Sequence, residues 1–382
     1  MIDYIIVGAG LFGSVFAQQA TAHGKKCLVI DKRTHIAGNI YTKIDNNTGI
    51  LKHVYGPHIF HTSDEIVWNY VNNYAKFSLF INSPIAIYKS EIYNLPFNMN
   101  TFNKLWGVVT PYEAKEYIKR NTVDFSTKRP KNLEEQAIAL VGMELYTKLI
   151  KGYTEKQWGK PCNSLPASII NRLPLRFNYD NNYFCDTYQG IPKDGYTKMI
   201  QNMLTGIPVE LETNYLEFAK HHSKLVKNAK KIIYTGKLDE YFNYCYGKLD
   251  YRSLKFEDKV LDMDNYQGVA VVNFTEKNIK QTRIIEHRHF DSKFHSSIDK
   301  TLISYEYPEE YRDENSEYPN DPYYPVNDKS NNCIAEQYKM LRKNVSPNVI
   351  FGGRLAEYKY YDMDKVIVSA IRAVKMEFGT LK

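Results

Sequence analysis

The chain has 382 residues, which is too long for one ordinary hydrophobic core, so we expect two or three domains. Hydrophobic residues make up 43% and charged residues 24%, as in globular proteins, and no apolar run approaches the roughly 20 residues that span a bilayer. The net charge of +7 is not gathered into a Lys/Arg block or a basic stripe with aromatic residues, which argues against a nucleic-acid partner.

The N-terminal segment predicts a strand, a glycine turn, a helix and a second strand. Residues 5–7 form a β-branched run, and residues 15–20 continue as a helix. A second strand at residues 27–30 ends at Asp31. The turn holds three glycines in G-x-G-x-x-G spacing, Gly8, Gly10 and Gly13. This order is typical of a dinucleotide-binding βαβ unit, and we expect such a site rather than a purely structural turn.

Each part of this unit has a physical role in binding a dinucleotide. Gly8 lets the chain turn tightly after the strand, and Gly10 removes the Cβ that would block a pyrophosphate. Gly13 lets the helix and the strand pack closely. The helix N-terminus offers N–H groups and the positive end of its dipole to phosphates. Asp31 can accept hydrogen bonds from an adenosine ribose.

Helical patterns follow in the first half of the chain. Thr62 or Ser63 is expected to cap a helix that continues through Trp68 and Val71. Residues 98–150 have helical spacing, with Asn132 as an N-cap. In the last of these helices five apolar residues repeat every four positions, Leu133, Ala137, Val141, Leu145 and Leu149. This segment therefore predicts a helical domain.

The second half is richer in strand patterns. Residues 171–192 and 241–310 are rich in Tyr, Phe, Thr and Val and predict antiparallel strands. Between them lie a predicted helix at residues 193–206 and an apolar run at 229–236 that resembles a returning strand of the nucleotide domain. The C-terminus predicts a strand, a Gly-Gly-Arg turn, a tyrosine-rich loop and a helix opened by Asp362 or Asp364.

The predicted fold class is α/β, with a discontinuous FAD-binding Rossmann-like domain, an inserted helical domain and an antiparallel β-sheet substrate domain. The FAD-binding domain is expected to comprise residues 1–78, 193–240 and 325–382. The helical domain is expected at residues 98–148. The substrate domain would then comprise residues 80–97, 149–192 and 241–324.

Two features favour FAD over NAD as the dinucleotide. The segment KRTHIAGN directly after Asp31 is a common flavoprotein continuation, whereas an NAD dehydrogenase more often continues its doubly wound sheet. The C-terminal strand, Gly-Gly turn and helix would aim a helix N-terminus at the flavin, where its positive dipole end stabilises an anionic reduced ring.

Many longer motifs resemble those of bacterial UDP-galactopyranose mutases. They include HVYGPHIFHT, LPFNMNTF, KGYTEKQWG, LPASIINRLPLRFNYDNNYF, YQGIPKDGYTKMI, YRSLKFE, QTRIIEH, DPYYPVND and FGGRLAEYKYYDMD. The resemblance extends over essentially the whole chain, in the order that the family has. It implies an isomerase that interconverts UDP-galactopyranose and UDP-galactofuranose. FAD is active there only when reduced, its N5 acting as the nucleophile at the anomeric carbon without net redox change.

The resemblance also implies which residues form the active site. Arg172 and Arg283 match arginines at the substrate phosphates, where the guanidinium fork suits two phosphate oxygens. His58 matches a histidine beside the flavin and the sugar. Three tyrosines match residues whose hydroxyls reach the diphosphate, Tyr183, Tyr324 and Tyr360. We expect the catalytic residues to be Arg172, Arg283, His58, Tyr324 and Tyr360.

Further substrate contacts are implied in the same way. Tyr153 and Phe184 match residues that hold the uracil, and Trp158 matches a tryptophan on a mobile loop that closes over the substrate. A buried core tryptophan is the alternative for Trp158. The other matched substrate-binding positions are Tyr183, Asn82, Arg252 and Asn273.

For the cofactor, the glycine motif itself gives Gly8, Gly10, Gly13 and Asp31. The resemblance adds Gly38, Asn39, Arg354, Asp362 and Met363, with Asp362 near the ribityl hydroxyls and Met363 offering a backbone N–H. One departure is Ala37, where family members commonly have glycine; alanine is tolerated there if its φ is negative.

Other kinds of protein remain as alternatives. A flavin oxidoreductase of the amine-oxidase type would share the FAD framework, and a sensor would bind without turnover. His221, His222, His287 and His289 lack further ligands at suitable spacing, so no metal is expected. No base can be placed beside Cys185, so a nucleophilic cysteine is not expected.

The partners and the compartment follow from similar reasoning. The absence of a signal-peptide pattern and five scattered cysteines indicate a cytoplasmic protein with reduced thiols. No membrane partner is expected. The resemblance implies a homodimer that receives electrons from a cellular reductant such as NAD(P)H or a reduced flavin donor.

Overall fold

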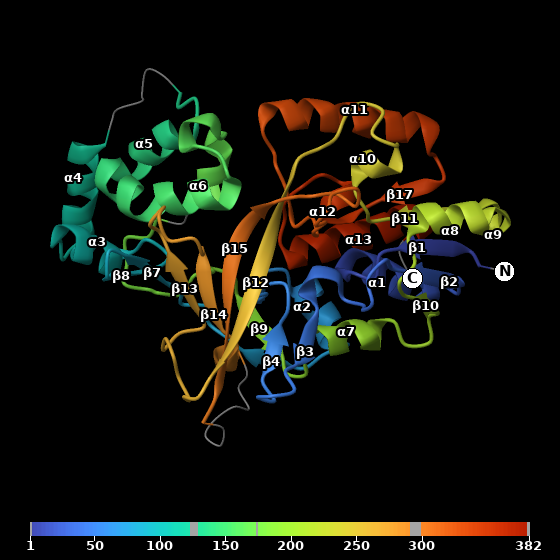
Figure 1. Ribbon diagram of the computed structural model, residues 1–382, viewed down its shortest axis with the longest axis horizontal. Helices are drawn as coiled ribbons and strands as arrows, with labels where there is room; N and C mark the ends of the chain where they lie inside the picture. The colour runs from blue at the N-terminus through green and yellow to red at the C-terminus, as the bar shows by residue number, and fades with distance from the viewer. Residues whose placement is uncertain (1, 123–128, 173–174, 291–298, 380–382) are drawn as a thin grey trace.

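The computed structural model describes residues 2–122, 129–172, 175–290 and 299–379. Figure 1 shows a parallel sheet with its helices at one end, a long antiparallel sheet in the middle and a group of helices at the other end. The protein has a mixed α/β fold, as predicted. In the described ranges, no helix is both long and apolar enough to cross a membrane.

The nucleotide-binding region is built on a five-stranded parallel sheet in the order β10-β2-β1-β11-β17. The strands are β1 (Tyr4–Val7), β2 (Cys27–Ile30), β10 (Val209–Glu210), β11 (Lys231–Tyr234) and β17 (Val349–Phe351). All four pairings are parallel. Segments from the start, the middle and the end of the chain therefore join in one sheet, and the predicted returning strand at residues 229–236 is confirmed as β11.

Helices cover both faces of this sheet. Because side chains alternate along a strand, Ile6 of β1 packs with α1 (Leu11–Ala22) and α13 (Met363–Phe378) on one face. Ile5 packs on the other face, against α8 (Tyr215–His221) and α9 (Ser223–Asn228). The helices α1 and α13 pack against each other beside the sheet (Figure 1).

The central sheet has seven strands in the order β16-β12-β15-β14-β13-β7-β8. They are β7 (Ile85–Tyr88), β8 (Glu91–Asn94), β12 (Tyr251–Leu261), β13 (Val271–Phe274), β14 (Arg283–Glu286), β15 (Thr301–Glu310) and β16 (Tyr324–Pro325). The sheet was expected to be antiparallel, but β13 pairs with β7 in parallel. The reason is that β7 enters from a distant part of the chain, so no hairpin fixes its direction.

The helical region consists of α3 (Met99–Trp106), α4 (Pro111–Asn121), α5 (Leu133–Leu145), a π-helical turn (Tyr146–Lys151) and α6 (Gly152–Trp158). The side chain of Asn132 accepts a hydrogen bond from Glu135 N, which confirms the predicted N-cap. All five residues of the four-residue repeat are buried in one cluster, Leu133, Ala137, Val141, Leu145 and Leu149. Gly142 interrupts the helix with a φ of 77°.

Smaller elements connect these regions. They are β3 (Thr42–Ile44), β4 (Leu51–His53), β5 (Phe60–Thr62), α2 (Glu65–Asn72), β6 (Phe77–Leu79), β9 (Tyr188–Pro192), α7 (Gly195–Met203), α10 (Leu238–Tyr241), α11 (Lys329–Val345) and α12 (Gly353–Ala356). Short 3-10 turns lie at Gly38–Ile40, Cys162–Ser164, Ala167–Arg172 and His287–Phe290.

Two local predictions were wrong. Asp64, not Thr62 or Ser63, caps α2, because its carboxylate accepts from both Ile66 N and Val67 N. A carboxylate at this position also interacts well with the helix dipole. The strand-rich prediction for residues 171–192 holds only for β9 among the described residues. In the segment before β9, the Arg176 guanidinium donates to the carbonyls of Asn182 and Tyr183, and these hydrogen bonds stabilise an irregular loop in place of a strand.

Candidate active site

The glycine turn after β1 has the geometry that the motif predicts. Gly8 has a φ of +108°, and a Cβ there would lie 2.0 Å from Thr235 Oγ1. A Cβ on Gly13 would lie 2.0 Å from the carbonyl oxygen of Gly8, so this glycine lets helix and strand pack closely. A Cβ on Gly10 would meet only Gly38 Cα, at 3.9 Å. Gly10 therefore leaves open space at the N-terminus of α1, as a closely approaching phosphate requires.

Asp31 stabilises the same turn from the end of β2. Its two carboxylate oxygens accept hydrogen bonds from Ala9 N at 2.7 Å and from Arg33 N at 2.9 Å. The side chain is buried yet lines the adjoining pocket. A carboxylate oxygen can accept more than one hydrogen bond, so these contacts leave the predicted bond to a ribose feasible.

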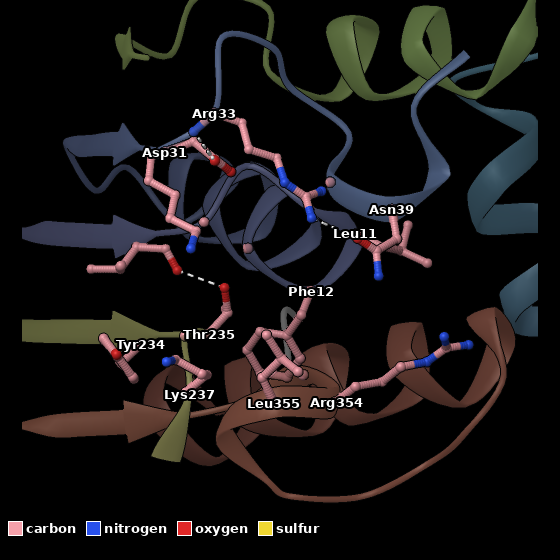
Figure 2. A pocket seen from close by; sticks show the side chains of 18 of the residues that line it. Leu11, Phe12, Asp31, Arg33, Asn39, Tyr234, Thr235, Lys237, Arg354 and Leu355 are labelled. Atoms are coloured by element: carbon pink, nitrogen blue, oxygen red, sulfur yellow. Dashed lines mark hydrogen bonds between the residues drawn. The ribbon is translucent and has the colours of Figure 1, made fainter. Parts of the chain in front are cut away.

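A pocket that is partly open to solvent begins at this turn. Figure 2 shows it between the N-terminal segment, with Asp31, Arg33 and Asn39, and the C-terminal segment, with Arg354. Eight of the nine predicted cofactor residues line it, Gly8, Gly10, Gly13, Asp31, Gly38, Asn39, Arg354 and Met363. His58 lines it as well. Asp362, the ninth, is not among the lining residues and stands at the N-cap of α13.

Lys237 and Arg354 lie on opposite sides of the pocket in Figure 2, and residues 213–216 and His58 also line it. His58 interacts electrostatically with Arg354, so it belongs to the Arg354 side, which we call the inner end of the pocket. The N-cap positions of α1 and α13 are Gly10 and Asp362, and neither uses a side chain to cap its helix. Backbone N–H groups at both ends thus face the region where phosphates or a flavin ring would lie.

The lining residues to which the sequence analysis gave no role include Arg33, Thr235 and Lys237. Arg33 donates to Asn39 Oδ1 at 2.9 Å and pairs with Asp321 at 3.1 Å, so it joins two walls of the pocket. Thr235 Oγ1 donates to the carbonyl of Val7 at 2.7 Å (Figure 2). The signal that could have found Thr235 and Lys237 is their place directly after a returning parallel strand, where ligands bind.

His58 lies on an irregular loop at the inner end of the pocket. Its Nδ1 lies 2.9 Å from the carbonyl of Gly56, which can only accept, so Nδ1 carries the proton and Nε2 is an acceptor. Burial and the positive charges of Arg354 and Arg283 lower the pKa of His58 to about 4. The imidazole is therefore neutral at physiological pH.

A directed chain of hydrogen bonds supports the His58 loop from behind. His58 N donates to His53 Nδ1 at 3.2 Å, and His53 N donates to His287 Nδ1 at 3.3 Å. His287 Nε2 bonds Ser304 Oγ at 2.7 Å, and Ser304 in turn donates to Asp258 at 2.7 Å. The direction of each bond requires both ring Nδ1 atoms to be unprotonated, so His53 and His287 are neutral.

A second group of predicted residues gathers around Arg283. Asn273, Arg283 and Glu306 are register partners on β13, β14 and β15, so they lie in one row across the sheet. The buried carboxylate of Glu306 accepts from both Nε and Nη2 of Arg283. Although burial opposes the charge, the carboxylate of Glu306 raises the pKa of Arg283, which stays cationic. Glu306 had no assigned role in the sequence analysis.

Four predicted tyrosines interact electrostatically with this arginine or with one another, Tyr153, Tyr183, Tyr324 and Tyr360. The rings of Tyr324 and Tyr360 are 5.4 Å apart. Burial raises the pKa values of Tyr153, Tyr183 and Tyr324, so their hydroxyls stay protonated and can donate hydrogen bonds. His58 also interacts with Arg283, which places this cluster beside the inner end of the dinucleotide pocket.

Two family models match parts of the chain. A family model described as UDP-galactopyranose mutase matches residues 148–360, and one described as an NAD(P)-binding Rossmann-like domain matches residues 6–74. A probable UDP-galactopyranose mutase of Klebsiella pneumoniae is 39% identical over 97% of this chain and 93% of that protein.

The chain belongs to the UDP-galactopyranose mutase family. It is an isomerase, and its cofactor is FAD.

Other relatives show how far this family extends. A dTDP-fucopyranose mutase of Escherichia coli is 38% identical over 98% of both chains. A crystal structure of reduced UDP-galactopyranose mutase covers 99% of this chain and 94% of that one, with a TM-score of 0.75 and 13% identity. A putrescine oxidase structure has a TM-score of 0.58 at 12% identity, so it shares the fold alone.

Not every residue predicted from the mutase family lies where it was expected. Trp158 was expected on a loop, but it is the last residue of α6, half-buried beside the core of the helical region. Gly152, the first residue of α6, packs against the carbonyl of Thr275. The side chain of Arg172 lies outside the described residues; its backbone ends a 3-10 turn.

The remaining substrate-binding predictions are spread around the Arg283 cluster. Arg252 was expected to contact substrate, yet its Nε donates to Gln157 O at 3.0 Å and its Nη2 to Lys156 O at 3.4 Å, at the end of α6. The carbonyl of Asn82 accepts from Tyr183 N at 2.8 Å. The ring of Phe184 stacks on His61, with centroids 3.7 Å apart. The roles of all predicted site residues stay predictions.

Ala37 departs from the family pattern in a way that affects the backbone. Its φ is +74°, in the left-handed region, so the condition under which alanine is tolerated is not met. Ala37 N donates to Ala9 O, which holds the residue against the glycine turn. Among the described residues, no group of three or more His, Cys, Asp or Glu side chains could hold a metal ion.

Proposed function

We propose that this enzyme interconverts UDP-galactopyranose and UDP-galactofuranose and so supplies galactofuranose for cell-surface glycans. When bound and reduced, FAD would supply N5 as the nucleophile at the anomeric carbon, without net redox change. The observation that carries the proposal is the Arg283–Glu306 pair surrounded by tyrosines at the inner end of the dinucleotide pocket. The names of the curated relatives support the same sugar nucleotide.

Arg283 is suited to bind the diphosphate. Its guanidinium has five N–H donors, and the contacts with Glu306 use two of them. The fork is therefore fixed in orientation while further donors can serve phosphate oxygens. Holding a cation beside the departing diphosphate stabilises the charge that develops there. We propose that Arg172 contributes in the same way.

The tyrosines would complete the substrate site. The hydroxyls of Tyr183, Tyr324 and Tyr360 can donate to phosphate oxygens without adding charge. The flat face of Tyr153 suits stacking on uracil, with Phe184 beside it. Neutral His58, with Nε2 as an acceptor, would contact the sugar or the flavin. Asn82, Asn273 and Trp158 are proposed to line the substrate, and Asp362 to approach the ribityl chain.

We further propose that the enzyme works in the cytoplasm as a homodimer, reduced by NAD(P)H or a reduced flavin donor. The three-domain division at the bounds predicted from sequence is part of this proposal. The separate core clusters of the nucleotide-binding and helical regions support it.

A second candidate substrate is dTDP-fucopyranose. The E. coli dTDP-fucopyranose mutase is nearly as similar to this chain as the Klebsiella relative is, and it covers the chain equally well. The two nucleotides differ at the thymine methyl and the ribose, and the two sugars at one hydroxyl. A pocket without a partner for that hydroxyl would discriminate only weakly between them.

Turnover with each sugar nucleotide tests the proposal. Purified holoenzyme, oxidised and then reduced with dithionite, is incubated with UDP-galactofuranose, and the products are separated by chromatography. We expect conversion to UDP-galactopyranose only in the reduced sample, with no stoichiometric reoxidation of the flavin. Faster conversion of the dTDP-fucose pair would favour the second candidate. Consumption of oxygen in proportion to product would contradict an isomerase.

A further inference from the structure

Lys156 makes an unusual set of contacts next to the candidate substrate site. It lies in the middle of α6, and its ammonium reaches the hairpin that joins β13 to β14. Nζ donates to Phe274 O at 2.7 Å, Ile279 O at 2.9 Å and Gln281 O at 2.9 Å. An ammonium has three N–H donors, so all of them are used by backbone carbonyls of one hairpin.

These contacts connect the two segments that carry the predicted substrate residues. Tyr153 is three residues before Lys156, on the adjacent helical turn. On the hairpin, the carbonyl of Phe274 follows Asn273, and that of Gln281 lies two residues before Arg283. Lys156 thus bridges the helix that would hold the nucleobase and the strands that would hold the diphosphate.

Further contacts keep the same two segments together. Thr275 Oγ1 donates to Lys148 O at 2.8 Å, and Lys277 pairs with Glu155 at 2.8 Å. Arg252 holds the C-terminal end of α6 from β12, directly opposite Tyr324 in the sheet register. The spacing of α6 from the sheet is therefore fixed at several points, with Lys156 at the centre.

An ammonium that is removed from water and surrounded by carbonyls contributes less to folding stability than an apolar side chain would in the same place. The carbonyl dipoles replace the lost hydration, but they do not cancel the charge. Burial lowers the pKa of Lys156 to about 8, and Glu276 opposes this shift. The other charges near it are the Glu155–Lys277 pair and Arg252, which itself bonds the Lys156 carbonyl. Lys156 therefore supplies directional hydrogen bonds to the hairpin at the expense of folding stability.

We propose that Lys156 is a positioning residue: its three hydrogen bonds set the spacing between Tyr153 and Arg283, and thereby the affinity of the enzyme for the nucleotide part of its substrate. This inference rests on the proposed function of that site. We propose that Lys156 acts through Tyr153 and Arg283 and does not itself contact the substrate or the cofactor.

The first test replaces Lys156 with methionine, which keeps the length of the side chain and removes the donors. UDP binding to the holoenzyme is measured by calorimetry, and KM and kcat are measured with the sugar nucleotide. For Lys156→Met we expect the Kd for UDP and the KM to rise about tenfold, with unchanged FAD content. Lys119→Met, the same change on the exposed face of α4, serves as the control and should leave both constants unchanged.

The second test uses pH and stands even if Lys156→Met fails to fold. In the wild type, deprotonation above pH 8 removes one donor and should weaken UDP binding. Lys156→Arg keeps its charge there, so the alkaline loss of affinity should disappear. An alkaline loss identical in both proteins, or a folded Lys156→Met protein with wild-type UDP affinity, would overturn the proposal. Failure of wild-type turnover alongside normal UDP binding would instead count against the proposed reaction.

Discussion

Arg283 and Glu306 face each other on the adjacent strands β14 and β15, and two guanidinium N–H groups donate to the buried carboxylate. The pair holds a cation in one orientation beside the tyrosine cluster. Without Glu306, Arg283 would be a half-buried positive charge without its carboxylate partner. Without Arg283, the cluster would lose the cation that we propose for the diphosphate.

Replacing Arg283 with alanine should nearly abolish turnover while FAD stays bound. The developing charge on the diphosphate would lose its cation, and removal of such a group costs roughly 100- to 1000-fold in kcat. The measurement is kcat of the reduced enzyme together with the flavin absorbance of the purified protein. Arg120→Ala, at an exposed surface pair on α4, is the control. Wild-type turnover in Arg283→Ala would refute the assignment.

Replacing Glu306 with glutamine should weaken both the fold and the binding of UDP. The neutral amide cannot accept from both N–H groups, and the half-buried Arg283 loses its counter-charge, which we expect to cost about 1–3 kcal/mol of unfolding free energy. Denaturant unfolding and UDP calorimetry measure the two effects. Glu257→Gln breaks an exposed pair with Lys255 and should change either quantity little. Equal effects of the two substitutions would show that the buried pair has no special role.

The stability of the protein should fall as the pH drops below about 6.5, because His53, His58 and His287 are neutral in the folded state. The pKa of His58 is lowered to about 4 and that of His287 to about 3, and the pKa of His53 is also lowered, chiefly by burial. Unfolding restores ordinary values near 6.5, so the unfolded chain binds more protons below that pH. Each histidine then contributes a slope of up to about 1.4 kcal/mol per pH unit.

Chemical unfolding at several pH values between 7 and 5 measures this slope. His287→Gln should reduce the slope of unfolding free energy against pH by the contribution of one histidine, up to about 1.4 kcal/mol per pH unit. His221→Gln, at an exposed position, is the control and should leave this slope unchanged. A wild-type slope that does not decrease in His287→Gln would mean that His287 is already charged in the folded protein.

Replacing Ala37 with glycine should stabilise the protein. The left-handed φ of +74° costs an alanine roughly 1–2 kcal/mol, part of which the greater freedom of glycine in the unfolded chain offsets. We expect a net gain of about 0.5–1 kcal/mol in thermal or chemical unfolding of the holoenzyme. The same substitution at Ala114, inside α4, should instead destabilise the protein by about 1 kcal/mol. A loss of stability in Ala37→Gly would contradict the strain.

The sequence by itself determined the dinucleotide unit and the main helix of the helical region. In both, the signals are local: the glycines, the strand and the helix of residues 4–31 are contiguous, and the repeat from Leu133 to Leu149 needs only helical geometry. The motifs of the mutase family also pointed to five further residues that line the dinucleotide pocket, Gly38, Asn39, His58, Arg354 and Met363.

Only the tertiary structure decided how the substrate side is assembled. Glu306 becomes the partner of Arg283 through the register of β14 and β15, and His53 meets His287 across elements far apart in the chain. Lys156 and Arg252 turn out to hold α6, because their donors find carbonyls brought there by the sheet. No spacing within the sequence encodes these contacts, since register and long-range packing fix them only once the strands have paired.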